Sequence, residues 1–231
     1  FMLETNVLDS NAEIKTIARN SHKSFIKKFL LMRLCMKKIH EKFMLNKINY
    51  VVTKGMAMKL HGMYKSNSRE FRDIDILVSK ESFEEAYKAL RSLGFEYFNK
   101  RSSDGINFLG CMHHIPPMIN KDGVIIELHH RLTLPEFFDT CPLYKNALDS
   151  KIQKDDVYVV SEDILIAHVI YHGLMHNKDN INPVLIFDLK EILVSTNYKK
   201  VNCDLFVSKN NFLFFNKIYE HLKNINDKTL Y

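Results

Sequence analysis

The chain has 231 residues, of which 46% are hydrophobic and 26% are charged, an ordinary mixture for a globular protein. At about 150 residues per domain, this length fits one large domain or two small ones. Seven glycines and five prolines exclude collagen-like and low-complexity chains, and no apolar run approaches the ~20 residues that cross a bilayer. The first residues lack the basic and apolar segments of a secretory signal, so we expect a cytoplasmic protein without a membrane partner.

The net charge of +6 and an isoelectric point near 9.0 are compatible with a polyanionic partner such as a nucleic acid or a nucleotide phosphate. Much of the excess lies in lysines between residues 15 and 47, which solvated helix faces explain equally well. The four cysteines lie far apart without a Cys-x-x-Cys pair. This spacing argues against a zinc ribbon and a disulfide framework, and favours reduced thiols.

The N-terminal part carries apolar side chains at helical spacing, which predicts two amphipathic helices within residues 11–45. A short β-type run at 50–52 follows, and Lys54-Gly55 then leads into a helical pattern over 56–63. A glycine between a strand and a helix predicts a strand–turn–helix unit.

Most of the predicted strands lie between residues 74 and 129. A strand over 74–78 precedes a helix over 79–93, which Gly94 ends. Further β-type runs occupy 96–99, 106–109, 114–119 and 124–129. The turn signal Asn-Lys-Asp-Gly at 120–123 joins the last two runs into a predicted hairpin.

Helical spacing returns after Pro135, with stretches at 161–176, 183–194 and 213–222. The sequence therefore predicts an α+β fold in three parts. These are N-terminal helices over 1–47, a mixed β-sheet core flanked by helices over 48–135, and a mainly helical C-terminal unit over 136–231.

Asp73 and Asp75 are the most informative residues of the chain. Side chains alternate along a strand, so these two carboxylates project from the same face, while Ile74, Ile76 and Val78 point into a core. Neighbouring carboxylates repel each other, and a hard divalent cation such as Mg²⁺ would relieve that repulsion. The alternative interpretation is a solvent-facing edge strand with two harmless acids.

Two more features favour a phosphate-handling site. The helix that begins near Gly55 offers unpaired backbone N–H groups and a positive dipole end to an anion, although the glycine could simply make a tight turn. Glu127 follows a fully apolar run on a predicted strand. Buried acids are costly unless they are paired or bind a metal, so Glu127 is a candidate third metal ligand.

This ordered set of motifs resembles the DNA polymerase β-like nucleotidyltransferase superfamily. Within it, the chain is most similar to the bacterial family with a Leu-Lys-Gly motif and an Arg-x-x-x-Asp-Ile-Asp-Leu-Leu-Val motif. Residues 54–57 match the first motif, 69–78 the second, and 126–129 the Glu-Leu-His stretch of that family. C-terminal matches extend the resemblance over roughly 48–195: Ser161-Glu162-Asp163, His172, His176 and Asp188-Leu189. The sequence departs from the wider superfamily at Met56, where Ser or Gly usually follows the glycine.

The resemblance implies a nucleotidyltransferase-type mixed sheet and a Mg²⁺-dependent transfer of a nucleoside monophosphate from an NTP. The acceptor it implies is RNA, a protein or a small molecule. It implies that the catalytic residues, which hold Mg²⁺ or Mn²⁺, are Asp73, Asp75 and Glu127. The implied nucleotide-binding residues are Lys54, Gly55 and Arg69. Candidate substrate-contacting residues are His129, His172 and His176.

Three carboxylates at close range should repel, so we expect at least one of their pKa values to rise. On the same reasoning, Asp75→Asn should raise the stability of the metal-free protein slightly, because it removes one negative charge.

Other interpretations compete with this function. His168, His172 and His176 recur four residues apart on one predicted helix, so they could bind zinc or form a plain core-facing stripe. A nucleotidyltransferase fold without activity could serve as a binding protein, such as a toxin–antitoxin or regulatory component. A metal-dependent phosphohydrolase with a histidine base is the third alternative.

Overall fold

A mixed seven-stranded β-sheet with strand order β3-β4-β5-β2-β1-β7-β6 forms the centre of the computed structural model, which describes residues 12–64, 71–98, 113–132, 143–175 and 183–195. The strands are β1 (Tyr50–Thr53), β2 (Asp73–Val78), β3 (Glu96–Tyr97), β4 (Met118–Ile119), β5 (Ile125–His129), β6 (Ile152–Lys154) and β7 (Val157–Val159). The helices are α1 (Ala12–Leu45), α2 (Lys54–Leu60), α3 (Phe83–Ser92), α4 (Leu143–Asp149), α5 (Glu162–Met175) and α6 (Pro183–Ser195). The predicted α+β class is confirmed.

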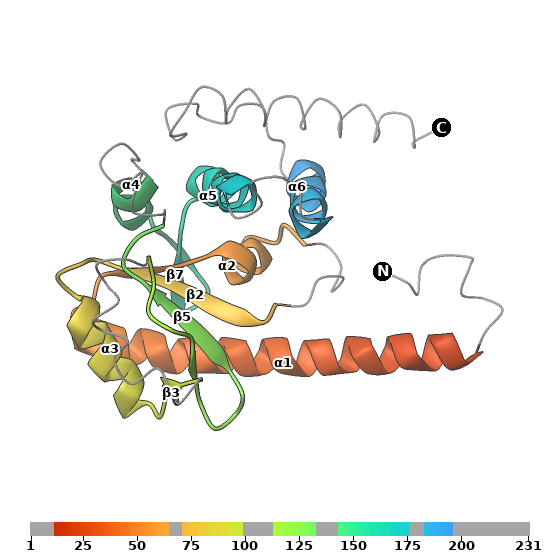
Figure 1. Cartoon of the computed structure of the whole chain (residues 1–231), viewed down its shortest axis with the longest axis horizontal. Coiled ribbons are helices and arrows are strands. Elements are labelled where there is room, and N and C mark those ends of the chain that lie inside the picture. Colours follow the sequence, from red (N-terminus) through yellow and green to blue (C-terminus); the bar gives the residue numbers. More distant parts are fainter. Residues whose placement is uncertain (1–11, 65–70, 99–112, 133–142, 176–182, 196–231) are drawn as a thin grey trace.

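The helices form two layers around the strands. Figure 1 shows α1 and α3 on one side of the sheet and α2, α4, α5 and α6 on the other. Within these layers α1 contacts α3, and α5 contacts α2, α4 and α6. The central strands are therefore covered on both faces, which is why β2 has buried residues at consecutive positions.

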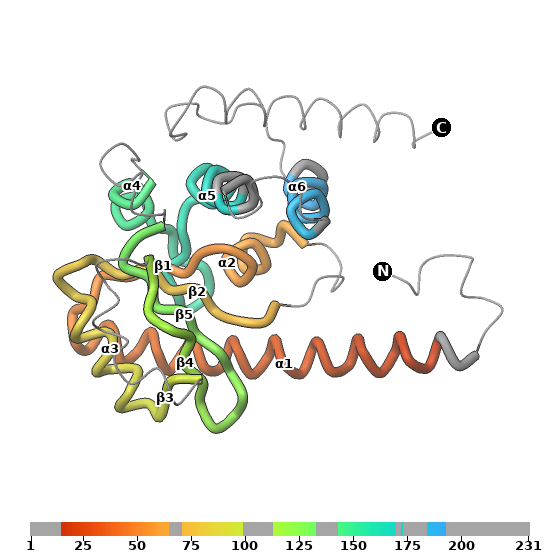
Figure 2. Tube along the Cα trace, in the orientation of Figure 1, coloured from red at the N-terminus to blue at the C-terminus, as the bar shows by residue number. Residues whose placement is uncertain are grey.

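One continuous helix, α1, replaces the two helices that we expected in the N-terminal part, so that expectation is wrong. No glycine or proline interrupts residues 12–45, and the apolar spacing continues through the middle of the segment. Met32, Met36, Ile39 and Phe43 are buried against the rest of the protein. Figure 2 shows α1 running along the strands and continuing past them toward its N-terminal end.

The three central strands bring distant parts of the chain into one row. β1 pairs with β2 in antiparallel orientation, so Thr53 lies opposite Asp75. β2 pairs with β5 in parallel orientation, so Asp75 lies opposite Glu127. Because β2 lies between β5 and β1, the alternative interpretation of Asp73 and Asp75 as acids on an exposed edge strand is wrong.

The hairpin predicted around residues 120–123 joins β4 to β5 in antiparallel orientation. The Asn120 side-chain oxygen accepts hydrogen bonds from the backbone N–H groups of Asp122 and Val124. Gly123 adopts a positive φ of 77°, which glycine tolerates best. The strand predicted over 106–109 lies outside the described residues.

The C-terminal part contributes α5 and α6 as predicted, and also two strands that the sequence analysis did not identify. β7 pairs with β1 in parallel orientation and β6 pairs with β7. Each has three residues, too few for a period-2 pattern to be recognised. The helix predicted over 213–222 lies outside the described residues, and the three-part division of the chain stays a prediction. In the described part of the chain, no helix is long and apolar enough to span a membrane.

Candidate active site

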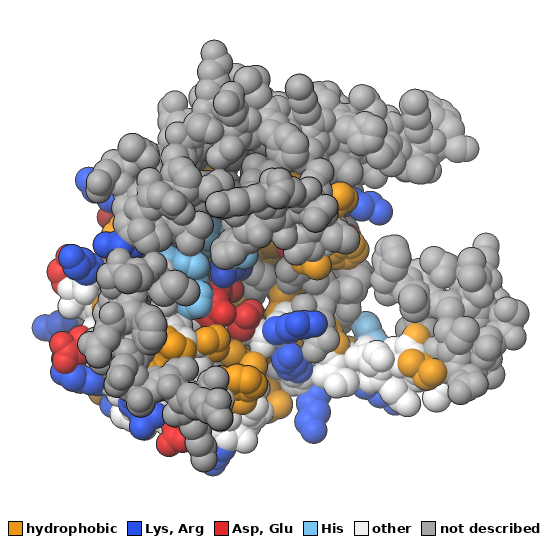
Figure 3. All heavy atoms as spheres, in the orientation of Figure 1, with side chains coloured by type: hydrophobic (Ala, Val, Ile, Leu, Met, Phe, Trp, Pro, Cys, Tyr) orange, Lys and Arg blue, Asp and Glu red, His pale blue; other side chains and the backbone are white. Residues whose placement is uncertain are grey.

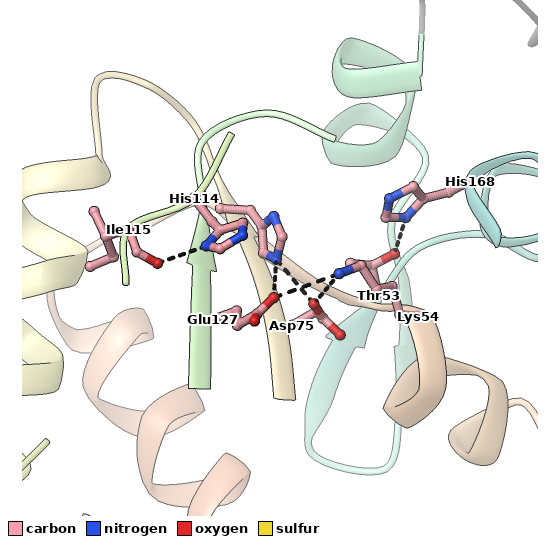
Figure 4. A network of polar contacts seen from close by, with 8 residues as sticks. Thr53, Lys54, Asp75, His114, Ile115, Glu127 and His168 are labelled. Carbon is pink, nitrogen blue, oxygen red and sulfur yellow. Dashed lines mark hydrogen bonds and ion pairs between the residues drawn. The ribbon is translucent and has the colours of Figure 1, made fainter. Parts of the chain in front are cut away.

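A compact group of charged side chains lies where β1, β2 and β5 are side by side, around the register partners Asp75 and Glu127. Asp75 is buried, with 3% of its surface exposed, and its register partner Glu127 is 18% exposed in its side chain. Partners in a parallel pair point to the same face of the sheet. Figure 4 shows the carboxylates of Asp75 and Glu127 side by side, with Lys54 reaching them from the end of β1.

Lys54 supplies a buried positive charge to both acids. Its Nζ lies 2.6 Å from Asp75 Oδ1 and 3.7 Å from Glu127 Oε2. Burial alone would lower the pKa of Lys54, but Asp75 and Glu127 raise it above its ordinary value. The backbone of Lys54 has a φ of +52°, a conformation that costs a non-glycine residue roughly 1–2 kcal/mol. This turn brings the side chain at the start of α2 back over the strand ends.

His129 lies against the same two oxygens. Its fully buried ring has Nε2 3.0 Å from Asp75 Oδ1 and 3.5 Å from Glu127 Oε2. Burial opposes ionisation of both acids, but Lys54 and His129 outweigh it and hold the pKa of Asp75 well below its usual range. Burial would also raise the pKa of Glu127, but other contacts lower it below its ordinary value. The hydrogen bond with His129 contributes most to this lowering. Both carboxylates are therefore ionised at neutral pH.

Asp73 lies two residues before Asp75 on β2 and is half-buried. Burial, followed by the negative charges of Asp75 and Glu127, raises the pKa of Asp73 to about 6. The expected raised pKa therefore belongs to Asp73. The ion pair of Asp75 with Lys54 argues against our expectation that Asp75→Asn stabilises the metal-free protein, because the substitution would remove the charge that stabilises the Lys54 ammonium.

A buried hydrogen bond connects this group to α5. Thr53 Oγ1 and His168 Nδ1 share a hydrogen bond of 2.8 Å, and Figure 4 shows it beside Lys54. Burial, followed by the charge of Lys54, lowers the pKa of His168 well below its ordinary value. From the sequence, we identified His168 only as a member of a histidine stripe. Two sequence features could have identified the pair. Thr53 is a polar residue at the end of an apolar strand, and His168 is a polar residue within an apolar helix.

The remaining candidate residues lie apart from this group or outside the described residues. The His172 ring lies 6.1 Å from the His168 ring, measured between centroids. Arg69 and His176 lie outside the described residues, so the zinc alternative for the stripe of three histidines stays a prediction. Gly55 is the second residue of α2.

Three side chains of the group could hold a metal ion. One ligand atom from each of Asp75, Glu127 and His129 lies within 4.8 Å of the others. Two ionised carboxylates suit a hard cation such as Mg²⁺, so the donor set fits the implied cofactor. Figure 3 shows acidic side chains gathered beside histidine side chains in the middle of one face of the molecule, and the partial exposure of Glu127 gives a cation access from solvent.

Comparisons with known proteins agree with this architecture. A family model described as an uncharacterised nucleotidyltransferase matches residues 5–222. The chain is similar to the solution structure of the antibiotic-resistance factor ANT(2'')-Ia, with a TM-score of 0.50 and 12% identity over 88% of this chain and 99% of that one. It is also similar to an antigenic nucleotidyltransferase-like protein from Paracoccidioides brasiliensis, with a TM-score of 0.52 and 13% identity over 83% and 89% of the two chains. No curated protein matches the chain. The fold is that of a nucleotidyltransferase.

Proposed function

We propose that this chain, which belongs to the family of uncharacterised nucleotidyltransferases, transfers a nucleoside monophosphate from an NTP to an acceptor and releases pyrophosphate. One observation carries the proposal: Asp75 and Glu127 lie side by side in register on parallel strands, with Lys54 against both. Such a group can hold a cation and a triphosphate at the same place. We propose the cytoplasm as the location, where NTPs are available.

In this proposal, Asp73, Asp75 and Glu127 bind Mg²⁺ or Mn²⁺. A bound divalent cation would neutralise triphosphate charge and lower the pKa of the attacking hydroxyl. Asp75 and Glu127 need not lose a proton to bind it at neutral pH, because their pKa values are already lowered. Asp73 has a pKa raised to about 6, so it completes the set of ionised ligands only above that pH.

The nucleotide-binding residues of the proposal are Lys54, Gly55 and Arg69. The flexible side chain of Lys54 can turn its ammonium from a carboxylate to a phosphate oxygen by rotation about its own bonds. Gly55 follows directly and has no side chain to keep a phosphate from its backbone N–H. The role of Arg69 rests on the sequence motif alone.

The acceptor remains one of three chemical classes: RNA, a protein side chain or a small molecule. His129, His172 and His176 are the proposed substrate-contacting residues. The contacts of His129 with Asp75 and Glu127 support this role, because the acceptor hydroxyl would approach the same carboxylates.

The experiment uses NTPs labelled at the α- or the γ-phosphate, with Mg²⁺ or Mn²⁺ and acceptors of each class. We expect α-label to enter an acceptor, and Asp75→Asn and Glu127→Gln to reduce incorporation by at least about 10²-fold. Asp122→Asn is the matched control, because Asp122 is an exposed acid in the turn that precedes β5. Release of γ-phosphate as inorganic phosphate, without incorporation, would identify a phosphohydrolase instead.

One sequence feature favours the second candidate, a binding protein with little or no turnover. Met56 stands where the wider superfamily has a serine or glycine, and it is fully buried, so it provides no hydroxyl for a phosphate. NTP binding without incorporation into any acceptor class, unchanged by Met56→Ser, would support this candidate over the transferase.

A further inference from the structure

His129 stands out among the residues of the site because an imidazole is an unusual neighbour for a Mg²⁺ site. It follows Glu127 by two positions on β5, so both side chains project from the same face. The ring is fully buried, and its Nε2 points at one oxygen of Asp75 and one of Glu127. In the described part of the protein, Nδ1 of the same ring has no hydrogen-bond partner. The arrangement concentrates the polar contacts of the ring on the two carboxylates.

The spacing of these atoms matches that of ligands around one ion. With metal–ligand bonds of about 2.1 Å, neighbouring ligands lie ~3.0 Å apart in an octahedron and ~3.4 Å apart in a tetrahedron. His129 Nε2 lies 3.0 Å from Asp75 Oδ1 and 3.5 Å from Glu127 Oε2. All three ligand atoms lie within 4.8 Å of one another. Small side-chain rotations would bring them to a common ion without moving the strands.

We propose that His129 Nε2 is a direct ligand of the same cation as Asp75 and Glu127, and that the site therefore selects Mn²⁺ or a similar first-row transition ion over Mg²⁺. Imidazole nitrogen suits transition ions, whereas Mg²⁺ prefers oxygen ligands and keeps several waters. This inference rests on the proposed function only in assuming that the carboxylates bind a cation. It changes the role of His129 from an acceptor contact to a metal ligand.

The competing interpretation gives His129 a hydrogen-bonding role alone. In that case Nε2–H donates to Asp75 and holds the carboxylate while oxygens and waters bind the ion. The two interpretations differ in whether a nitrogen atom is bonded to the metal, which pulsed electron paramagnetic resonance of Mn²⁺ detects directly.

The test is therefore an electron spin-echo measurement on the full chain loaded with Mn²⁺ in the absence of NTP. We expect ¹⁴N modulation from a bound imidazole in the wild type, and its loss in His129→Asn and His129→Gln. His114→Gln is the matched control, because the His114 ring lies 5.0 Å from that of His129 but its Nδ1–H donates to the Ile115 carbonyl. Its ¹⁴N signal should remain.

Competition titrations provide the second measurement. We expect the wild type to bind Mn²⁺ at least about tenfold more tightly than Mg²⁺, and His129→Asn to lose about tenfold or more in Mn²⁺ affinity. If the His129 variants fail to fold, the wild-type ¹⁴N signal and the absorption spectrum of bound Co²⁺ still decide the question. Absence of ¹⁴N modulation in wild type, or a preference for Mg²⁺, would overturn the inference.

Nucleotidyl transfer is measured separately on the same samples. Transfer without nitrogen ligation contradicts this inference and leaves the proposed function intact. Nitrogen ligation without transfer supports the inference and contradicts the proposed function.

Discussion

Lys54 is the residue through which α2 contacts both acids of the site. Its ammonium neutralises Asp75 and Glu127 from the start of α2, and its backbone adopts a left-handed conformation there. A divalent cation would bind the same carboxylate oxygens. In the proposed function, Lys54 and the cation would therefore compete for one pair of acids, and a triphosphate would offer the displaced ammonium a new partner.

We predict that Lys54→Met lowers the free energy of unfolding of the metal-free protein by about 2–3 kcal/mol, because it leaves Asp75 and Glu127 without their ammonium partner. Millimolar Mn²⁺ should restore more stability to the variant than it adds to the wild type. Urea unfolding with and without Mn²⁺ measures both effects. Lys88→Met, on the exposed face of α3, is the control and should leave stability and the Mn²⁺ response unchanged. If Mn²⁺ stabilises Lys54→Met and the wild type by the same amount, the prediction is contradicted.

The raised pKa of Asp73 predicts a pH dependence of stability. The folded pKa of about 6 exceeds the ordinary value of 3.8, so the folded protein binds more protons than the unfolded chain between these values. The contribution of Asp73 to stability therefore falls as pH rises from about 4 to 6 and then levels off. Asp73→Asn should be more stable than wild type at pH 7.5, by about 1–2 kcal/mol, and lose this advantage near pH 4.

Urea unfolding of wild type and Asp73→Asn between pH 4 and 8, without divalent cations, provides the measurement. Groups other than Asp73 are the same in both proteins, so the difference between the two curves isolates the effect of Asp73. A difference that does not change with pH would contradict the assigned pKa.

The helix α5 holds none of the charged residues of the site, but the Thr53–His168 hydrogen bond links it to the end of β1 beside Lys54. Thr53 precedes α2 in the position of a helix cap, yet its hydroxyl makes no capping bond to that helix. The hydroxyl instead fixes the end of β1 to α5. The position of Lys54 therefore depends on a residue far along the chain.

Thr53→Val keeps the side-chain shape but leaves His168 Nδ1 buried without this partner, so we predict a loss of about 1–3 kcal/mol in the free energy of unfolding. Thr53→Ser retains the hydroxyl and should lose less. In a double-mutant cycle with His168→Phe, the two substitutions should be non-additive. Additive effects would show that the hydrogen bond contributes nothing to stability.

The face by which α1 packs against the rest of the protein can be tested by comparing a buried and an exposed residue. Ile39 is fully buried and Leu34 is 61% exposed, although both are large aliphatic residues of the same helix. We predict that Ile39→Ala costs about 2–5 kcal/mol, whereas Leu34→Ala stays within about 0.5 kcal/mol of wild type. Chemical unfolding monitored by circular dichroism distinguishes them, and similar losses would indicate a different face in contact with the sheet.

Sequence patterns were informative where an element is long or its turn chemistry is specific. The alternation in β2 and the Asn120–Gly123 turn predicted a strand and a hairpin, and both are confirmed. The side-chain partners of the site were not predictable in the same way. The contacts of Lys54 and His129 with Asp75 depend on strand register and on a left-handed backbone, which no local pattern encodes. The strands β6 and β7 were not predicted, because three residues are too few to show a strand pattern.

For the whole molecule, the decisive connection is the parallel pairing of β7 with β1. It places a strand from the 136–231 part in the same sheet as the 48–135 part. Without β7, the edge of β1 and the fully buried core residue Val52 would be exposed. We therefore expect that residues 1–135 do not fold independently, and the division of the chain at residue 135 stays a prediction.

We predict that a fragment of residues 1–135 lacks cooperative unfolding and aggregates at concentrations at which the full chain stays in solution. Thermal unfolding followed by circular dichroism, together with light scattering, measures both properties against the full chain. A cooperative transition of the fragment would show that β6, β7 and α5 are dispensable for the core.

The same pairing has a consequence during synthesis. Val52 of β1 pairs with Val159 of β7, so the ribosome makes one partner long before the other. At ~5–20 residues per second, the delay is roughly 5 to 20 seconds. During that interval the nascent chain carries an unpaired, apolar strand edge, and Thr53 still lacks His168. A slow translation step between these strands would prolong the exposure, so synonymous codon changes there should alter the yield of soluble protein without altering a single amino acid.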